Sequence, residues 1–457
     1  MSNPSSATIA NGFEPAGGRK SWLDRTLSLF TDVQPGEGPT ALLLAANLFC
    51  LLAFYYILKT VREALILSEG GAEVKSYSAA LQALLLFAFV PAYSRLAAHM
   101  DRVRLIFGVT LFFASHLVIF YLLGVAGVHI GIVFFVWIGI FNLVVPAQLF
   151  AFANDIYTRE RGRRLLPLVG LGSSLGAMVG AGLAAVLFSR LGPYPLLMLS
   201  ATGLVACLAF TSLVDRREQK RDAAAARIAQ QPIGGRNGFR LVLSQRYLLL
   251  IALLVVLLNV VNSVGEFILG KLVIVHVKDL VAGGQANGLS ESVLIGSFYA
   301  SYFSWVNAIG LFIQLVLVSR IFKFVGVRGA MYFLPAIACV SYGLFAVFPV
   351  LALVRVTKIL ENSTDYSLQN TVRQALFLPT SREAKYNAKQ AIDAFFVRTG
   401  DLLQAGIVFV GGLLSMQMRG FAVLNLVFVA LWFVLVVAIG REHRKFPEPK
   451  ADEEVAA

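Results

Sequence analysis

The sequence predicts an all-α membrane protein with twelve transmembrane helices in two six-helix halves. Its 457 residues are 58% hydrophobic and only 14% charged, whereas soluble domains carry roughly 25% charged residues. Apolar runs of about 20 residues, which is the length that a helix needs to cross a lipid bilayer, recur along most of the chain. One long charged stretch interrupts them near the middle. The lipid bilayer is therefore the expected surrounding of both halves.

The apolar runs divide the chain into five segments. We expect a polar N-terminal tail (1–38), a first half (39–214), a charged linker (215–246), a second half (247–440) and a C-terminal tail (441–457). Two halves with the same number of spans are typical of transporters whose halves are related by an axis along the membrane normal. The predicted spans lie roughly at 40–64, 77–97, 103–125, 129–153, 165–188, 193–214, 247–275, 291–319, 326–347, 349–377, 388–414 and 420–440.

Lysine and arginine residues alternate between the two sets of loops. The loops after the second, fourth, sixth and eighth spans are rich in them. By the positive-inside rule, these loops and both termini are cytoplasmic. The opposite loops contain few, namely Lys75, Arg190, Lys278 and Arg419.

Motif patterns argue against an enzyme. The chain has no G-x-x-x-x-G-K-[ST] phosphate loop, so we do not expect ATP hydrolysis. Its five histidines lack metal-ligand spacing, and its three cysteines lie within apolar runs, where they are packing residues. We therefore expect no catalytic residue, metal, cofactor or nucleic-acid partner. A glycine-rich segment at 170–182 indicates close helix packing, with a conformational hinge as the alternative.

Charged residues inside the predicted spans need an explanation, because each costs at least about 2.5–3.5 kcal/mol at the bilayer centre on insertion scales. In the first span Lys59, Arg62 and Glu63 share one helical face with Tyr55. They form either a cationic wall for an anionic solute, or a group that snorkels to the membrane edge with Lys59 paired to Glu63.

The seventh span carries a polar stripe that ends in a carboxylate. Asn259, Asn262 and Ser263 precede Glu266. Hydrogen bonds between helices would explain the amides and the hydroxyl. An isolated Glu inside the membrane is harder to explain in that way, so we expect Glu266 to act in transport.

The stretch 355–401 carries the densest set of charges at membrane depth. Internal pairing would make these helices insertable, but paired charges still need a polar surface, which here means a cavity between the halves. In the tenth span Arg355, Lys358 and Asp365 lie on one stripe with Glu361 beside it, and the eleventh span carries Lys389 and Asp393 four residues apart.

Several motifs resemble those of the ATP/ADP translocase family of plastids and intracellular bacteria. Residues 58–65 (LKTVREAL) are similar to that family's first-span L-R-D-T-K-D-x-L motif. Residues 152–154 (FAN) and 167–172 (PLVGLG) are similar to its F-A-N and P-L-F-G-L-G motifs. Tyr366-Ser367-Leu368, Arg373, Pro379, Lys385, Lys389 and Ala391-Ile392-Asp393 resemble its K-Y-S-L-F-D-x-x-K-E and K-G-K-A-A-I-D motifs.

The resemblance implies a carrier of the major facilitator type in a bacterial inner membrane, which exchanges nucleotides without hydrolysing them. The family's functional Lys, Glu and Lys correspond here to Arg62, Glu266 and Lys389. A further Glu of the family corresponds to a position near Ile138 and is missing, and the family's K-E becomes Arg373-Gln374. These departures suggest a divergent member, whose substrate is a nucleotide or another phosphorylated anion.

We therefore predict a monomeric secondary transporter that exchanges nucleotides by alternating access. One alternative is a proton-coupled major facilitator carrier of another organic anion, drug or lipid, and another is a membrane scaffold or sensor that transports nothing. A pH gradient would drive the proton-coupled carrier. The predicted substrate-binding residues are Arg62, Lys389, Lys59, Lys358, Arg355 and Tyr366, and the predicted coupling or gating residues are Glu266, Asp365, Asp393 and Glu361.

Overall fold

The computed structural model describes residues 21–28, 31–157, 159–219, 238–381 and 384–446. Within these ranges the chain is helical and contains no strand. The first half comprises α1 (Trp22–Leu27), α2 (Gly38–Glu69), α3 (Gly71–Ala98), α4 (Arg102–Val125), α5 (Gly131–Ile156), α6 (Arg159–Leu191) and α7 (Pro193–Gln219). The second half comprises α8 (Gly238–Ser244), α9 (Arg246–Ala282), α10 (Glu291–Phe312), η2 (Ile313–Leu317), α11 (Val318–Ala330), α12 (Phe333–Val347), α13 (Leu351–Thr364), η3 (Asp365–Gln369), α14 (Asn370–Leu376), η4 (Ala384–Ala388), α15 (Lys389–Ala391), η5 (Ile392–Phe396), α16 (Val397–Leu413) and α17 (Met418–His443).

The predicted class, an all-α membrane protein, is confirmed. Ten helices of the described residues are long and apolar enough to cross a membrane. Helix α12 is apolar but has only 15 residues. The tenth predicted span is charged and is divided into α13, the π-helical turn η3 and α14. The count of twelve depends on these two segments and stays a prediction.

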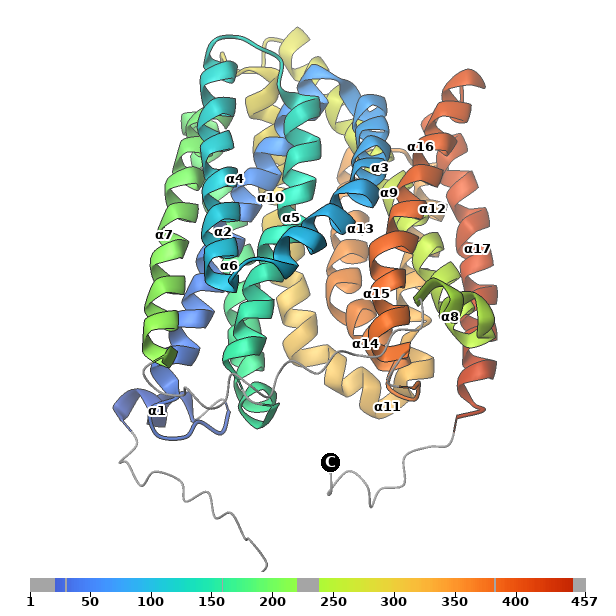
Figure 1. Ribbon diagram of the computed structural model, residues 1–457. Helices are drawn as coiled ribbons and strands as arrows, with labels where there is room; N and C mark the ends of the chain where they lie inside the picture. The colour runs from blue at the N-terminus through green and yellow to red at the C-terminus, as the bar shows by residue number, and fades with distance from the viewer. Residues whose placement is uncertain (1–20, 29–30, 158, 220–237, 382–383, 447–457) are drawn as a thin grey trace, which may run out of the picture.

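The boundaries between the predicted segments follow the helices only in part. Helix α7 continues to Gln219, and α8 and the first residue of α9 occupy the end of the predicted linker. Residues 220–237 of that linker and 447–457 of the C-terminal tail lie outside the described residues. In Figure 1, α2 begins and α17 ends at the lower end of the helical bundle. We call this the termini end, and we call the end with the turn at Gly70 the far end.

The glycine-rich segment packs directly on the backbone of another helix, as predicted. A Cβ atom at Gly172, Gly176 or Gly180 of α6 would lie 2.2–2.4 Å from a backbone oxygen of α2. Any larger residue at these three positions would therefore push the two helices apart. This close contact holds α2 against α6 and sets the position of the polar residues farther along α2.

The described part of the predicted N-terminal tail packs on the termini end of the bundle. The carboxylate of Asp24 in α1 accepts a hydrogen bond from the backbone N–H of Gly38 at 2.9 Å. Burial alone would raise the pKa of Asp24, but its hydrogen bonds from backbone and side-chain donors outweigh burial and hold the pKa below the ordinary value. Next to Gly38, Glu37 forms ion pairs with Arg161 at 3.0 Å and Arg164 at 3.1 Å on α6.

The two halves contact each other through small and polar residues. Helix α3 of the first half lies beside α9 and α16 of the second half (Figure 1). The amide of Gln404 on α16 donates a hydrogen bond of 2.9 Å to Ser76 on α3. Gly296 on α10 faces the ring of Phe188 on α6 so closely that a Cβ atom there would lie 2.0 Å from it.

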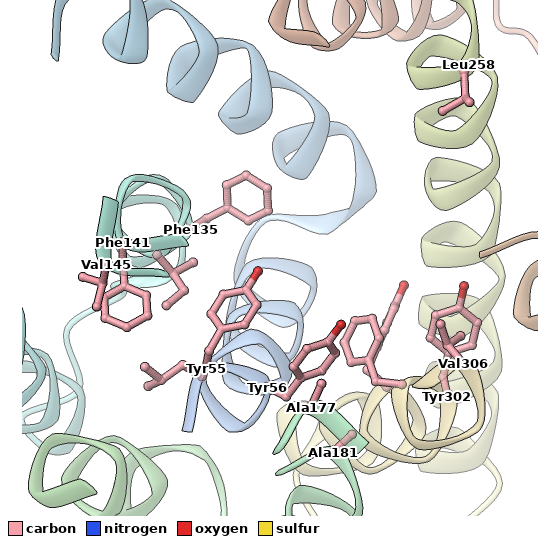
Figure 2. Packing of buried hydrophobic residues seen from close by; sticks show 14 of the residues in the cluster. Tyr55, Tyr56, Phe135, Phe141, Val145, Ala177, Ala181, Leu258, Tyr302 and Val306 are labelled. Carbon is pink, nitrogen blue, oxygen red and sulfur yellow. The ribbon is translucent and has the colours of Figure 1, made fainter. Parts of the chain in front are cut away.

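Aromatic side chains of α5 and α10 flank the middle of α2 on two sides. Tyr55 and Tyr56 lie between α5 and α10 (Figure 2). The ring centroid of Tyr55 is 6.2 Å from that of Phe141 on α5, and the centroid of Tyr56 is 6.2 Å from that of Phe303 on α10. Both tyrosines are buried. Tyr55 and Tyr56 lie about one helical turn before Lys59, which is the first charged residue of α2.

Candidate functional site

A cavity of about 170 Å³ lies between the two halves, and we call it the central cavity. Helices α2, α3 and α5 of the first half line it together with α9, α10, α13, η3 and α16 of the second half. A cavity lined from both halves is where the substrate site of a two-half transporter is expected. Its lining residues are Lys59, Arg62, Glu63, Lys75, Ser76, Ala79, Phe135, Asn262, Ser263, Glu266, Phe267, Phe303, Asn362, Tyr366 and Gln404.

Four charged residues form a continuous series across the cavity wall, which we call the ionic chain. Arg62 forms an ion pair with Glu63, its neighbour on α2. The second oxygen of Glu63 lies 2.6 Å from the Nζ atom of Lys75 on α3. Lys75 Nζ is also 4.0 Å from Glu266 on α9. The ionic chain thus joins the two halves, with cations and carboxylates in alternation.

Lys59 lies in an aromatic cage and forms no ion pair with a carboxylate of the described residues. Its Nζ atom is 4.3 Å from the ring centroid of Phe303, 5.1 Å from that of Tyr56 and 5.5 Å from that of Tyr366. Such cation–π contacts stabilise a desolvated ammonium group. The structure does not support the alternative in which Lys59 snorkels and pairs with Glu63, because Lys59 lines the central cavity and Glu63 pairs with Arg62 and Lys75.

Arg62 presents its charge to the central cavity while its partner is hidden. The Arg62 side chain is 17% exposed and that of Glu63 is 1% exposed. The guanidinium group stacks over the ring of Phe135 on α5, with 4.8 Å between them. An anion that enters the cavity would therefore meet the cation before the carboxylate. Of the predicted binding residues, Arg62, Lys59 and Tyr366 line this cavity, and so does the predicted coupling residue Glu266.

Lys75 is a cavity residue that the sequence analysis assigned to a loop. The apolar run of the second span begins only at residue 77, which left Lys75 outside it. In the structure Gly70 alone separates α2 from α3, so α3 begins at Gly71 and Lys75 lies a full turn inside it. Lys75 Nζ also lies 5.5 Å from the ring centroid of Tyr299 on α10. A sequence prediction that recognised this one-residue turn would have placed Lys75 inside a helix.

Lys358 belongs to a second polar network, of whose members Asn262 lines the central cavity and the others lie behind its wall. Its side chain is 0% exposed, and it is not among the residues that line the central cavity. Its Nζ atom donates hydrogen bonds to Asn262 at 2.7 Å and to Glu361 at 3.1 Å. The hydroxyl of Tyr342 on α12 donates to Glu361 at 3.1 Å. We call these four residues the Lys358 network, and their position does not support the predicted contact between Lys358 and substrate.

Glu266 connects the Lys358 network with the ionic chain. One of its oxygens lies 3.9 Å from Lys358 Nζ, while the other lies 4.0 Å from Lys75 Nζ. The amide of Asn362 and the hydroxyl of Tyr302 donate to it at 2.9 Å and 3.2 Å. Glu266 is 20% exposed and Lys75 is 13% exposed, so the central cavity reaches both of them, whereas Lys358 is fully buried.

Three predicted residues lie in another group on the termini side of the central cavity. Lys389 donates a hydrogen bond to Gln374 on α14. Arg373 lies close enough for its charge to act on both Asp365 and Asp393. One oxygen of Asp365 is buried and lacks a hydrogen-bond partner among the described residues. None of these residues lines the central cavity.

Arg355 lies apart from all three groups. Its guanidinium donates a 2.8 Å hydrogen bond to the hydroxyl of Ser301 and lies 5.1 Å from the ring centroid of Phe298 on α10. It does not line the central cavity. The regular spacing of Arg355 with Lys358 and Asp365 along one helical stripe therefore does not bring the three side chains to one site. The π-helical turn η3 contributes to this separation, because it changes the periodicity at Asp365.

Comparisons with known proteins identify the family of the chain. The model of the family described as "Major Facilitator Superfamily" matches residues 40–366. The chain is 22% identical over 343 residues to ADP,ATP carrier protein 1 of Chlamydia muridarum, and the match covers 66% of this chain and 62% of the relative. It is 24% identical over 345 residues to ADP,ATP carrier protein 1 of Chlamydia pneumoniae, covering 66% and 64%. The match thus spans less than two thirds of these relatives, and it confirms the resemblance seen in the motifs.

Solved structures share the fold at low identity. An auto-inhibited POT family peptide transporter has a TM-score of 0.61 at 13% identity, covering 90% of this chain and 98% of its own. A bacterial homologue of the iron transporter ferroportin also has a TM-score of 0.61 at 13% identity, covering 88% and 98%. The nucleoside transporter NupG has a TM-score of 0.57 at 13% identity, covering 89% and 100%. These proteins carry different solutes, so the likeness identifies the architecture alone.

Proposed function

This chain belongs to the Major Facilitator Superfamily, and we propose that it exchanges nucleotides, such as ATP for ADP, across a bacterial inner membrane. In this proposal the two halves rock about the central cavity, which opens to one side at a time. Both termini face the cytoplasm, as the distribution of Lys and Arg in the loops indicates. ATP is carried and not hydrolysed.

The observation that carries the proposal is the central cavity with its cations. Lys59, Arg62 and Lys75 line it from the first half, against two carboxylates, Glu63 and Glu266. A cavity enclosed between membrane helices holds such cations for an anionic solute. The relatives in Chlamydia are named as ADP,ATP carriers, which favours a nucleotide among the anionic solutes.

Each group in the cavity suits one part of a nucleotide. Arg62 can hold two phosphate oxygens at once because its guanidinium is planar, whereas lysines act as point charges. Tyr366 is 42% exposed and lines the cavity, so its ring is available to stack on a base. Tyr55 is 7% exposed, which makes it less suited to that role. We propose that Glu266 changes partners as the halves rock, because it contacts both Lys75 and Lys358.

Exchange by purified protein in liposomes tests the proposal. Liposomes loaded with ADP are expected to take up labelled ATP, and Arg62→Ala is expected to lower the uptake at least about a hundredfold, because a charge-assisted phosphate contact and its geometry are lost. Lys278→Met removes an exposed charge at the far end of α9 and serves as the matched control. Normal exchange by Arg62→Ala would eliminate the central cavity as the substrate site.

Lys389 has a different expected role, because it lies outside the central cavity on the termini side. We propose that it receives the phosphates of a nucleotide that enters from the cytoplasm. Lys389→Ala is then expected to raise the apparent KM for nucleotide on the termini side more than on the far side. Equal changes on both sides would contradict this role.

A proton-coupled carrier of another organic anion is the second candidate, and Glu266 is the observation in its favour. This carboxylate is partly exposed to the cavity and contacts the buried Lys358 network. If Glu266 carries a proton, a pH gradient alone should drive accumulation, and Glu266→Gln should abolish this response. Exchange that needs only a counter-nucleotide inside the liposome excludes this candidate.

A further inference from the structure

We propose that Lys75 is a third phosphate-binding cation of the central cavity, and that Glu63 occupies the phosphate position as an internal competitor while the cavity is empty. The inference rests on the proposed function, because it concerns the phosphate of that same substrate. It goes beyond that function in two respects. It assigns a substrate contact to a residue outside the recognised motifs, and it gives the carboxylate beside Arg62 a role in substrate release.

The geometry of Glu63 is that of a bridging anion. One oxygen of its carboxylate is held by Arg62, and the other lies 2.6 Å from Lys75 Nζ. Two oxygens of a phosphate would bridge the same two cations in the same way, since carboxylates and phosphates both bind guanidinium and ammonium groups through paired oxygens. The distance between Arg62 and Lys75 is therefore already set for an anion with two adjacent oxygens.

The exposure of the three side chains shows how an incoming anion would reach them. Arg62 is 17% exposed and Lys75 is 13% exposed, whereas Glu63 is 1% exposed. Both cations line the central cavity. Each also has donors to spare, because Arg62 bonds to Glu63 through Nε and one terminal nitrogen, and an ammonium group carries three hydrogens. A phosphate can therefore contact both cations before Glu63 gives them up.

The backbone around Lys75 is held in place while its side chain has alternative partners. Ser76, the next residue, donates to the backbone oxygen of Ala72 at 3.1 Å and accepts from Gln404 at 2.9 Å. The Lys75 ammonium lies within 4.0 Å of Glu266 and near the ring of Tyr299. Movement of the ammonium group from Glu63 to a phosphate would thus require a rotation of the side chain and no shift of α3.

An internal competitor lowers the affinity for substrate, and a carrier benefits from this. A solute must bind well enough to enter and weakly enough to leave. With Glu63 in place, the free energy of phosphate binding is only the difference between the contacts that the phosphate makes with the two cations and the contacts of the carboxylate that it displaces. Without the negative charge of Glu63, the positive charges of Arg62 and Lys75 would be less fully neutralised, so the affinity of the cavity for any phosphate would rise.

Binding of ADP, and separately of inorganic phosphate, to the purified full-length chain tests the inference by calorimetry. Lys75→Met is expected to raise the Kd for ADP about tenfold to a hundredfold, as expected for one charge-assisted contact. Glu63→Gln keeps the shape of the side chain and removes its charge, and is expected to lower the Kd at least about tenfold while slowing exchange. A loss of affinity in Lys75→Met could also come from misfolding, but the gain in affinity expected for Glu63→Gln could not. The two variants therefore test the inference together.

The double variant Glu63→Gln, Lys75→Met separates competition from a merely structural ion pair. If Glu63 acts by occupying Lys75 and Arg62, the gain from Glu63→Gln is expected to shrink severalfold when Lys75 is already Met. Lys278→Met, an exposed lysine on α9, controls for removal of a positive charge and is expected to leave the Kd unchanged.

The outcomes distinguish this inference from the proposed function. A wild-type protein that neither binds nor exchanges nucleotides overturns both. Normal exchange by the wild type, with a Kd that Lys75→Met leaves unchanged, overturns the assignment of Lys75 alone. A Kd that Glu63→Gln leaves unchanged or raises would show that the carboxylate is structural, and would overturn the competitor role.

Discussion

The ionic chain and the Lys358 network are built from the same residue types but have opposite surroundings. Arg62 and Lys75 are 17% and 13% exposed and line the central cavity, whereas Lys358 is 0% exposed and Glu361 is 4% exposed. Both groups place charges on membrane helices, and for that reason members of both, such as Arg62 and Lys358, were predicted to act in transport. The difference between them is whether a solute can reach the charge.

The two groups also differ in how firmly their charged residues are held by their partners. Lys358 is held by Asn262 and Glu361, and Glu361 by Tyr342, so the network ties α9, α12 and α13 together. In the ionic chain Lys75 has two carboxylates at unequal distances, Glu63 at 2.6 Å and Glu266 at 4.0 Å. A fully satisfied buried network makes a helix bundle rigid, whereas a partly exposed one can exchange partners. From this comparison we expect the Lys358 network to contribute to stability and propose that the ionic chain acts in transport.

The largest expected effect comes from breaking the Lys358 network. Lys358→Met leaves Glu361 buried without its cation, which is expected to cost about 3–5 kcal/mol of unfolding free energy. Thermal unfolding of the purified protein in detergent would measure it. The double variant Lys358→Met, Glu361→Gln is expected to recover most of the loss, because no uncompensated charge remains. If Lys358→Met unfolds like the wild type and instead abolishes binding, the division between the two groups is wrong.

A smaller effect is expected at Gly265 of α9, which leaves room for the Lys358 network. A Cβ atom there would lie 2.2 Å from the Tyr342 hydroxyl and 3.0 Å from Lys358 Nζ. Gly265→Ala is expected to destabilise the protein by about 1–3 kcal/mol through overpacking, with the Kd for nucleotide almost unchanged. Gly343→Ala on α12 is the matched control, since nothing lies within 4 Å of its Cβ position. Equal unfolding temperatures for both variants would contradict the close fit.

The smallest effect is expected for Lys59, which combines features of both groups. It lines the cavity, yet three aromatic rings hold it and its described partners include no carboxylate. Lys59→Gln is expected to cost about 0.5–2 kcal/mol of stability through the lost cation–π contacts, and to raise the KM for exchange less than Arg62→Ala does. A loss of exchange as large as that of Arg62→Ala would move Lys59 into the primary phosphate site.

The sequence by itself determined the membrane class, the positions of most helices and the family resemblance. Long apolar runs leave a helix few alternatives in a bilayer, because every backbone polar group must be satisfied within the segment. The sequence also identified four residues of the central cavity: Arg62, Lys59, Tyr366 and Glu266. The glycines of α6 were recognisable as packing residues because helix spacing places them on one face.

Only the tertiary structure decided which charges share a site. Helical periodicity predicts which side chains lie on one face of a helix. It does not predict whether that face contacts another helix, the lipid or a cavity. Lys75 and Glu266 come from different halves of the chain and meet only because α3 lies against α9. Helical periodicity alone does not distinguish Lys358 from Arg62, and only the structure shows that Lys358 is buried against Asn262 and Glu361 and does not line the cavity. The cost of a buried charge depends on its surroundings, and those surroundings are assembled from helices that are distant in sequence.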